Sequence, residues 1–142
     1  MSITPVQIPA VLTPVVILAR PQMGENIGAT ARAMKNCGLM SLRLVTPRDG
    51  WPNPAAESMA SNAADILETA EVYASLPDAL HDIGHLVATS ARPRNMEKPV
   101  FTPRKAITEL VKRQASQHQG ESKRSALLFG AERSGLDNKE LM

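Results

Sequence analysis

The chain has 142 residues, of which 43% are hydrophobic, and this composition suits one globular domain with a substantial core. No apolar run is long enough to cross a bilayer, and the N-terminus lacks the basic start and small-residue cleavage site of a secretory signal. The single cysteine, Cys37, excludes an internal disulfide and a cysteine-based metal cluster. The sequence therefore predicts a cytoplasmic protein that does not associate with membranes.

The net charge of +2 conceals a strong segregation of charge along the chain. Residues 47–90 contain one Lys or Arg and seven Asp or Glu, whereas residues 91–124 contain nine basic and three acidic residues. A basic segment neutralises phosphates and releases counterions, which predicts a nucleic-acid partner, although Lys and Arg also simply solubilise a helix face. Aromatic residues make up only 3% of the chain, which argues against base stacking on a platform of exposed rings.

Strands and helices alternate in the first half of the chain. Residues 1–13 have little periodicity and predict an N-terminal arm. A β-branched run predicts a buried strand at 15–19. A glycine-containing loop follows, then an alanine-rich helix at 27–37 with Asn26 as its N-cap and Gly38 as its stop. The next elements are a strand at 42–46, a helix at 55–69 with a possible break near 61–62, and a short strand at 71–74 that is alternatively a linker.

The second half continues the alternation. A helix that begins at Ser75 or Pro77 is expected to end at Gly84, and a strand follows at 85–89. Residues 90–102 form a long polar loop of the kind that is usually functional or mobile. The remaining elements are a helix from Pro103 with Thr102 as its cap, a strand at 126–129, and a helix that begins at Leu136.

This alternation predicts an α/β fold with a mainly parallel sheet flanked by helices on both faces. In such sheets ligands bind beyond the carboxyl ends of the strands. Three loops follow strand ends and together hold four of the eight glycines: 20–28, 89–95 and 130–135. We therefore expect one crevice that is built from three distant segments.

The first of these loops leads into a candidate site. Gly28 and Arg32 are four residues apart on one helix face, and helical side chains lean toward the N-terminus. Arg32 is therefore expected to reach over Gly28 toward Asn26. A guanidinium beside an amide and free helix N–H groups suits an anionic or hydroxyl-bearing ligand. Spacing alone, however, favours an ordinary exposed arginine.

The third loop carries the pattern Gly130-x-Glu132-x-x-Gly135. Its two glycines allow close backbone approach to a ligand, and Glu132 places a carboxylate where it can hold a ribose hydroxyl or an arginine. An acid that is favoured by the helix dipole explains Glu132 equally well. A P-loop, a dinucleotide fingerprint and a nucleophile elbow are all absent, and the scattered histidines form no ligand pattern, so no metal is expected.

Two segments resemble motifs of the SpoU/TrmH branch of the SPOUT RNA methyltransferases. Residues 26–33 (Asn-Ile-Gly-Ala-Thr-Ala-Arg-Ala) resemble the first motif, and residues 128–136 (Leu-Phe-Gly-Ala-Glu-Arg-Ser-Gly-Leu) resemble the second. The sequence from about Pro14 to the end is most similar to TrmJ-type tRNA 2′-O-methyltransferases. The similar stretches include residues 19–26, 88–92 and 102–104.

The resemblance implies S-adenosylmethionine as cofactor, a homodimer, and methylation of a ribose 2′-hydroxyl, with tRNA position 32 in the anticodon loop as the expected target. Methylation of rRNA or of another tRNA site, and a non-catalytic RNA-binding module, stay open as alternatives. It implies catalytic roles for Arg32, Asn26 and Glu132, and cofactor contacts at Thr89, Ser90, Ala91, Gly130, Glu132 and Gly135. The expected RNA-binding residues are Arg20, Arg92, Arg94 and Lys98.

The family's third motif is absent from this sequence. The resemblance implies that it follows Met142 and completes a trefoil knot and much of the cofactor pocket. We therefore expect residues 14–142 to form a SPOUT α/β-knot core that is truncated before its third motif, after an arm at 1–13.

Overall fold

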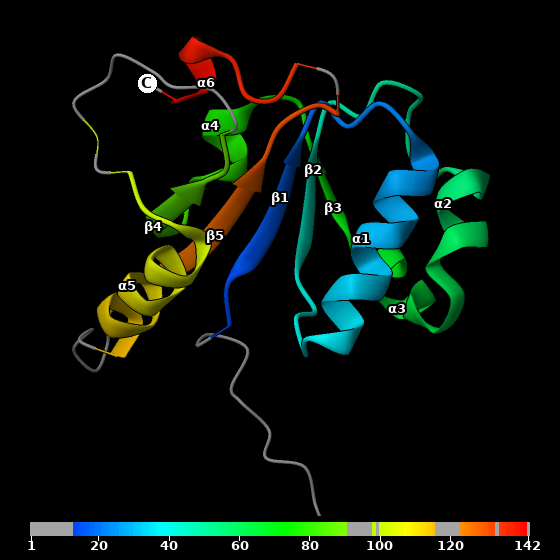
Figure 1. The fold of residues 1–142 in the computed structure, drawn as a ribbon. Coiled ribbons are helices and arrows are strands. Elements are labelled where there is room, and N and C mark those ends of the chain that lie inside the picture. Colours follow the sequence, from blue (N-terminus) through cyan, green and yellow to red (C-terminus); the bar gives the residue numbers. More distant parts are fainter. Residues whose placement is uncertain (1–12, 91–97, 99, 116–122, 133, 142) are drawn as a thin grey trace, which may run out of the picture.

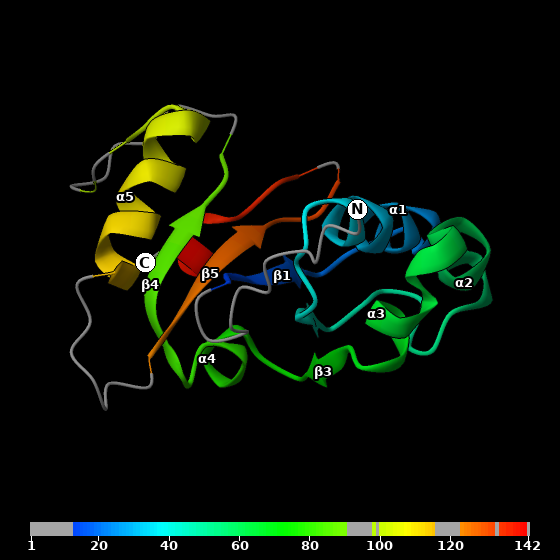
Figure 2. The ribbon, with the colours of Figure 1, turned by 90° about the horizontal axis from the view of Figure 1, so that it is seen from below.

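In the computed structural model, which describes residues 13–90, 98, 100–115, 123–132 and 134–141, five strands form one sheet with helices on both faces (Figures 1 and 2). The strands are β1 (Val15–Ala19), β2 (Leu42–Val45), β3 (Glu71–Tyr73), β4 (Ile83–Ala88) and β5 (Arg124–Phe129). The helices are α1 (Gly24–Asn36), α2 (Pro54–Ala60), α3 (Ala64–Glu68), α4 (Leu76–Ala79), α5 (Pro103–Ala115) and α6 (Asn138–Leu141), with the 3₁₀ helix η2 (Ser61–Ala63) between α2 and α3.

The sheet has the order β3-β2-β1-β5-β4, and all four strand pairs are parallel. This confirms the predicted α/β class. β1 lies at the centre and is buried along its whole length, as expected for a strand that is covered on both faces. Its neighbours β2 and β5 place their carboxyl ends at the same edge as β1, and this edge carries the candidate site.

Alternate residues of β1 point into two separate cores. Val16 and Leu18 pack with the buried residues of α1, α2 and α3 on one face. Val15 and Ile17 face the other side, where partly buried residues of α4 cover them. Figure 2 shows α1 and α5 on one side of the sheet and α4 on the other. Among the described residues, no helix has the length and apolar character that crossing a membrane would require.

The N-terminus of α1 differs from the prediction. The helix begins at Gly24, and Met23 is its N-cap in an extended conformation with no side-chain capping bond. Asn26 as N-cap was therefore wrong, because it lies inside the first turn. The N–H groups of Gln22 and Met23, just before the helix, are bound by an acceptor from another part of the chain, as described below.

Gly84 was also assigned wrongly as a helix stop. The helix α4 ends at Ala79, and Gly84 lies inside β4. A Cβ atom at Gly84 would lie 2.7 Å from the Cβ atom of Lys123, so the glycine lets β4 approach the segment that leads into β5. The predicted break in the 55–69 helix is confirmed, because Ser61 adopts a φ of 54° between α2 and η2.

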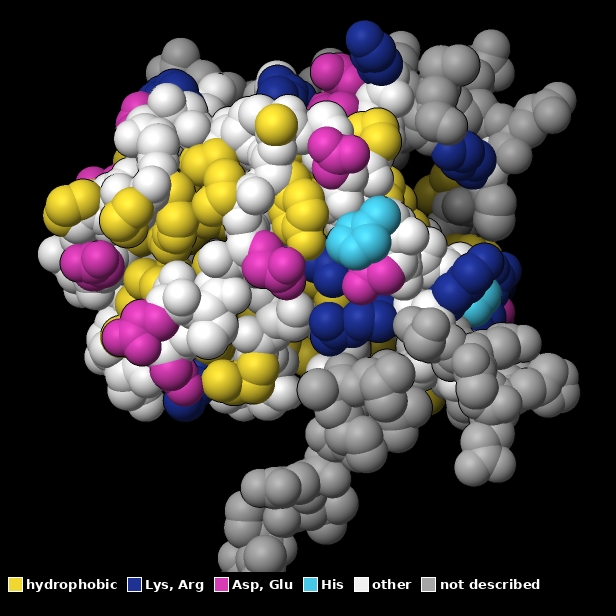
Figure 3. All heavy atoms as spheres, turned by 180° about the vertical axis from the view of Figure 1, so that it is seen from behind, with side chains coloured by type: hydrophobic (Ala, Val, Ile, Leu, Met, Phe, Trp, Pro, Cys, Tyr) yellow, Lys and Arg dark blue, Asp and Glu magenta, His cyan; other side chains and the backbone are white. Residues whose placement is uncertain are grey.

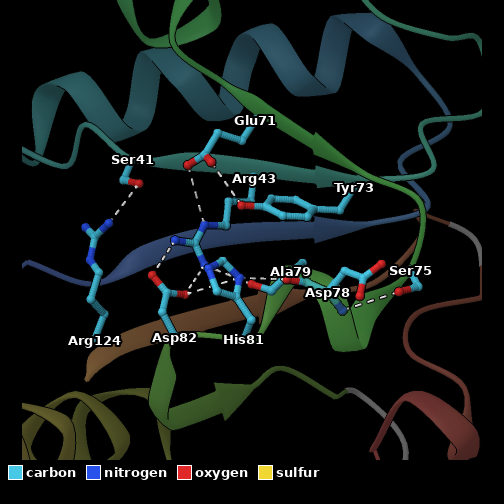
Figure 4. Close-up of polar contacts among 10 residues, drawn as sticks. All are labelled: Ser41, Arg43, Glu71, Tyr73, Ser75, Asp78, Ala79, His81, Asp82 and Arg124. Carbon is cyan, nitrogen blue, oxygen red and sulfur yellow. Dashed lines mark hydrogen bonds and ion pairs between the residues drawn. The ribbon is translucent and has the colours of Figure 1, made fainter. Parts of the chain in front are cut away.

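A buried arginine fastens β2 to the turn before β4 (Figure 4). Arg43 donates two hydrogen bonds to the carboxylate of Asp82, at 2.6 and 2.8 Å, and one to the carbonyl oxygen of Ala79 at 2.8 Å. Its guanidinium lies 5.7 Å from the centre of the Tyr73 ring. The hydrogen bond to Arg43 lowers the pKa of Asp82 to about 2, against the opposing effect of burial. This network holds the α4 side of the sheet together.

Candidate active site

The loops that follow β1 and β5 meet at the carboxyl edge of the sheet. The carboxylate of Glu132 accepts a hydrogen bond of 2.8 Å from the backbone N–H of Gln22 and a longer one of 3.4 Å from that of Met23. β1 and β5 are neighbouring strands, so both loops start from the same place. The predicted convergence of the 20–28 and 130–135 segments is confirmed.

Glu132 is held as a carboxylate by these contacts. Burial raises its pKa, but the N–H groups of Glu132 itself, Gln22 and Met23 and the side chain of Asn26 together lower it by more, so the net pKa is below its ordinary value. Asn26 of the first motif and Glu132 of the second are therefore electrostatically coupled. The two motifs place a fixed negative charge at the start of α1.

Arg20 also joins these two segments, and here a side chain of the first segment donates to acceptors of the second. Its Nη2 atom donates to Glu140 Oε1 at 2.6 Å and to the carbonyl oxygen of Gly135 at 3.4 Å, and its Nε atom donates to Glu140 Oε2 at 3.3 Å. The hydrogen bond to Glu140 raises the pKa of Arg20. The sequence predicted Arg20 as an RNA contact, whereas the structure gives its guanidinium partners within the chain.

Close backbone contacts require a glycine at Gly28 and at Gly130, and the sequence analysis did not identify these contacts. A Cβ atom at Gly28 would collide with the carbonyl oxygen of Ala56, so the bare surface of Gly28 is covered by α2 and is not open to Arg32. A Cβ atom at Gly130 would collide with the backbone of Gly135, which itself has a φ of 64°. Gly130 therefore allows the close backbone contact of its own turn.

Arg32 is exposed on α1, and no hydrogen bond or ion pair joins it to another described residue. The structure does not bring it into contact with Glu132. Its guanidinium is accordingly available to a molecule from outside this part of the chain.

The third loop is only partly described. Thr89 bonds through its backbone N–H to the carbonyl oxygen of Leu128 at 3.0 Å and through its hydroxyl to the same oxygen at 3.3 Å, which ties this loop to the end of β5. Ser90 and Lys98 are exposed. The predicted cofactor contact Ala91 and the predicted RNA contacts Arg92 and Arg94 lie outside the described residues. Among the described residues, no group of three or more His, Cys, Asp or Glu side chains is arranged to hold a metal ion.

One feature of the site escaped the sequence analysis although a signal was present. Asp137 and Glu140 form a reciprocal capping box, in which each backbone N–H donates to the other side chain, at 2.9 and 2.7 Å. An acceptor residue followed three positions later by Glu is the sequence signature of this motif. The box organises α6, and Arg20 binds its glutamate.

Comparisons with known proteins agree with this arrangement. A model described as the SpoU rRNA Methylase family matches residues 13–142. The tRNA (cytidine/uridine/adenosine-2′-O-)-methyltransferase TrmJ of Pseudomonas aeruginosa (strain UCBPP-PA14) is 40% identical over 126 residues, which cover 89% of this chain and 47% of the relative. The uncharacterized tRNA/rRNA methyltransferase LasT of Escherichia coli (strain K12) is 37% identical over 126 residues, covering 89% of this chain and 53% of LasT.

A solved structure extends the similarity to three dimensions. The crystal structure of TrmJ from Z. mobilis ZM4 superposes with a TM-score of 0.80 at 45% identity, over 91% of this chain and 54% of that one. The chain thus spans about half the length of the curated relatives that it matches.

Proposed function

The chain belongs to the SpoU rRNA methylase family, and we propose that it is the methyltransferase part of an S-adenosylmethionine-dependent enzyme that methylates a ribose 2′-hydroxyl of tRNA. The contact between the Glu132 carboxylate and the loop that opens α1 is the observation that carries this proposal. It joins the two motifs that resemble the active-site motifs of this family. The names of the relatives support tRNA as the substrate.

The described residues fit the proposed cofactor. S-adenosylmethionine supplies a methyl group on a positively charged sulfur, which is a good leaving group. Glu132 lies at the carboxyl edge as a carboxylate, because its pKa is lowered, and this charge favours a cationic ligand there. Thr89, Ser90 and the Gly130–Gly135 turn would hold the cofactor, together with Ala91.

Arg32 is the proposed catalytic residue. A guanidinium stays protonated and is a poor base, so Arg32 would act by orienting the ribose hydroxyl and its phosphate and by stabilising the alkoxide as it develops. Asn26 would orient the site through its coupling to Glu132. The exposure of Arg32 suits a homodimer in which Arg32 of one subunit serves the cofactor site of the other, as the family resemblance implies.

The proposed target is the pyrimidine at position 32 of the tRNA anticodon loop. A second candidate is another tRNA site or rRNA, and the similarity to LasT, which is named a tRNA/rRNA methyltransferase, favours it. Mapping of ribose methylation in total RNA from a strain that lacks the protein separates the two. Loss of methylation at tRNA position 32 supports the first candidate, and loss elsewhere supports the second.

The role of Arg32 is tested in the purified protein by calorimetry with S-adenosylmethionine and by a methyl-transfer assay on tRNA. Arg32→Ala is expected to remove most of the transfer, by about a hundredfold or more, and to leave cofactor affinity nearly unchanged. Lys35→Ala, which removes a positive charge from the same helix at a residue that pairs with Asp65, is the control and should retain activity.

Equal loss of transfer and cofactor affinity in Arg32→Ala would contradict its catalytic role. Absence of S-adenosylmethionine binding by the full-length protein, with the segment expected after Met142, would overturn the enzymatic proposal and leave an RNA-binding module as the better description.

A further inference from the structure

The backbone at the end of β1 is unusual for the residue that occupies it. Arg20 follows β1 with a φ of 53°, in the left-handed region that glycine adopts more easily than a residue with a side chain. An arginine in this conformation costs free energy that a glycine would avoid. The side-chain contacts of Arg20 offset part of this cost.

Its partner is a carboxylate that is already organised. The Glu140 side chain is only 12% exposed, and it accepts a hydrogen bond from the N–H of Asp137 within the capping box. Arg20 approaches both carboxylate oxygens, at 2.6 and 3.3 Å, in the two-pronged geometry that favours arginine over lysine. Arg20 therefore binds the 137–140 segment in the conformation that its capping box fixes.

The two loops hold each other at two points. Glu132 accepts from the backbone of residues 22 and 23, while Arg20 donates to Gly135 and Glu140. Leu136, between these points, is fully buried in the core on the α4 side of the sheet. Glu132 and residues 134–140 are thus held against the first motif in three ways. The Leu136 side chain is buried, Glu132 accepts hydrogen bonds from the first loop, and Arg20 of the first loop donates hydrogen bonds to Gly135 and Glu140.

A phosphate contact through Nε or Nη2 of Arg20 would conflict with this arrangement. These two nitrogens bind Glu140 and Gly135, so a phosphate that took them would leave a largely buried carboxylate without its charged partner. The loss of one member of such a pair costs much more than an exposed ion pair contributes. The observed contacts therefore favour a role for Arg20 within the chain.

We propose that Arg20 is a positioning residue, which fixes the turn at residues 130–136 in its ligand-binding conformation through Gly135 and Glu140. This inference rests on the proposed function, because the ligand of that turn is taken to be S-adenosylmethionine. Arg20 acts on the cofactor and not on the RNA, and Glu140 is its obligatory partner.

The test uses Arg20→Gln, Glu140→Gln, the double variant and Arg20→Lys in the purified protein, with S-adenosylmethionine and tRNA as separate ligands. Each Gln variant should weaken cofactor binding about tenfold, and the double variant should be no weaker than either single one. Arg20→Lys should recover part of the affinity because its charge is kept. The dependence of tRNA binding on salt should stay unchanged in all four.

Lys139→Gln is the matched control. Lys139 is exposed and adjoins Glu140 in α6, and no hydrogen bond or ion pair joins it to another described residue. It should leave cofactor binding unchanged. The proposal is overturned if Arg20→Gln lowers the salt slope of tRNA binding by about one, which is the signature of a lost phosphate contact. It is also overturned if Glu140→Gln leaves cofactor affinity intact.

Thermal unfolding of the same four proteins separates this proposal from the proposed function. The Arg20–Glu140 coupling should appear as non-additive losses of stability in the double-mutant cycle, whether or not a cofactor is present. Additive losses overturn the pairing itself. Coupled losses in a protein that binds no S-adenosylmethionine overturn the proposed function and the cofactor role of Arg20, while the structural pairing stands.

Discussion

At the scale of the single residue, the ion pair between Arg43 and Asp82 makes the stability of the protein depend on pH. The pKa of Asp82 is about 2, below its ordinary value of 3.8, because Arg43 binds its carboxylate. A lowered pKa contributes stability that is complete above the ordinary value and is lost as the pH falls through the folded-state value. The Asp82 carboxylate should therefore contribute about 1 to 2 kcal/mol that disappears between pH values of about 4 and 2.

The variant Asp82→Asn tests this contribution. At neutral pH it should be less stable than the unmodified protein by about 3 kcal/mol, because the buried Arg43 loses its charged partner. Denaturant unfolding should show that this difference shrinks as the pH falls toward about 2. Asp78→Asn, at an exposed carboxylate of α4, is the control and should change stability little at any pH. A difference that is constant with pH would contradict the assignment.

Sequence reasoning selected candidate residues of the site but not their partners. Asn26 and Glu132 were selected from their motifs, and in the structure the Asn26 side chain lowers the pKa of Glu132. Arg20 was predicted to contact RNA, and its partner in the structure, Glu140, is 120 residues away in sequence. Arg43 drew no attention for the same reason. Long-range ion pairs depend on tertiary geometry, which local spacing does not encode.

At the scale of the element, the contact between α1 and α2 is predicted to depend on Gly28. Gly28→Ala should lower the free energy of unfolding by about 2 to 3 kcal/mol, because the new methyl group would meet the α2 backbone rather than a flexible side chain. Ala29→Ser, at an exposed position of the same helix, should change it by less than about 0.5 kcal/mol. Thermal or denaturant unfolding of both variants measures these values. An undestabilised Gly28→Ala would show that α2 can move away from α1.

The order and type of the elements were predictable, while several boundaries were not. The strand at 71–74, which was alternatively a linker, is β3 and pairs with β2. The start of α1 was missed because its N-cap, Met23, makes no side-chain capping bond and so leaves no capping signal in the sequence. The role of Gly84 was missed because the neighbour that requires a glycine, Lys123, is distant in sequence. Local signals predict where a helix can begin, and tertiary contacts decide where it does.

At the scale of the whole molecule, the segregation of charge predicts where the proposed RNA substrate binds. In Figure 3 basic side chains lie more toward the side of α5, while acidic ones extend from the side of α2 and α3 to the middle of the face. Replacement of Arg92, Arg94 and Lys98 by Gln should weaken tRNA binding and lower its salt slope by about two to three, because each lost phosphate contact removes about 0.7 to 0.9.

Filter-binding titrations over a range of salt concentrations measure this slope. Lys35→Gln removes a positive charge from the last turn of α1, where Lys35 pairs with Asp65, and serves as the control. Its slope should match that of the unmodified protein. An unchanged slope in the triple variant would place the phosphate contacts elsewhere on the surface.

The position of β5 in the sheet has a consequence for synthesis of the protein. Among the described strands β5 comes last in sequence, yet it lies between β1 and β4. Until residues 124–129 have left the ribosome, β4 has no sheet neighbour, and one edge of β1 stays unpaired. A nascent chain therefore exposes an open strand edge, of the kind on which aggregates form. The second motif, residues 128–136, overlaps the end of β5, so closure of the sheet and the meeting of the two motifs belong to the same late step.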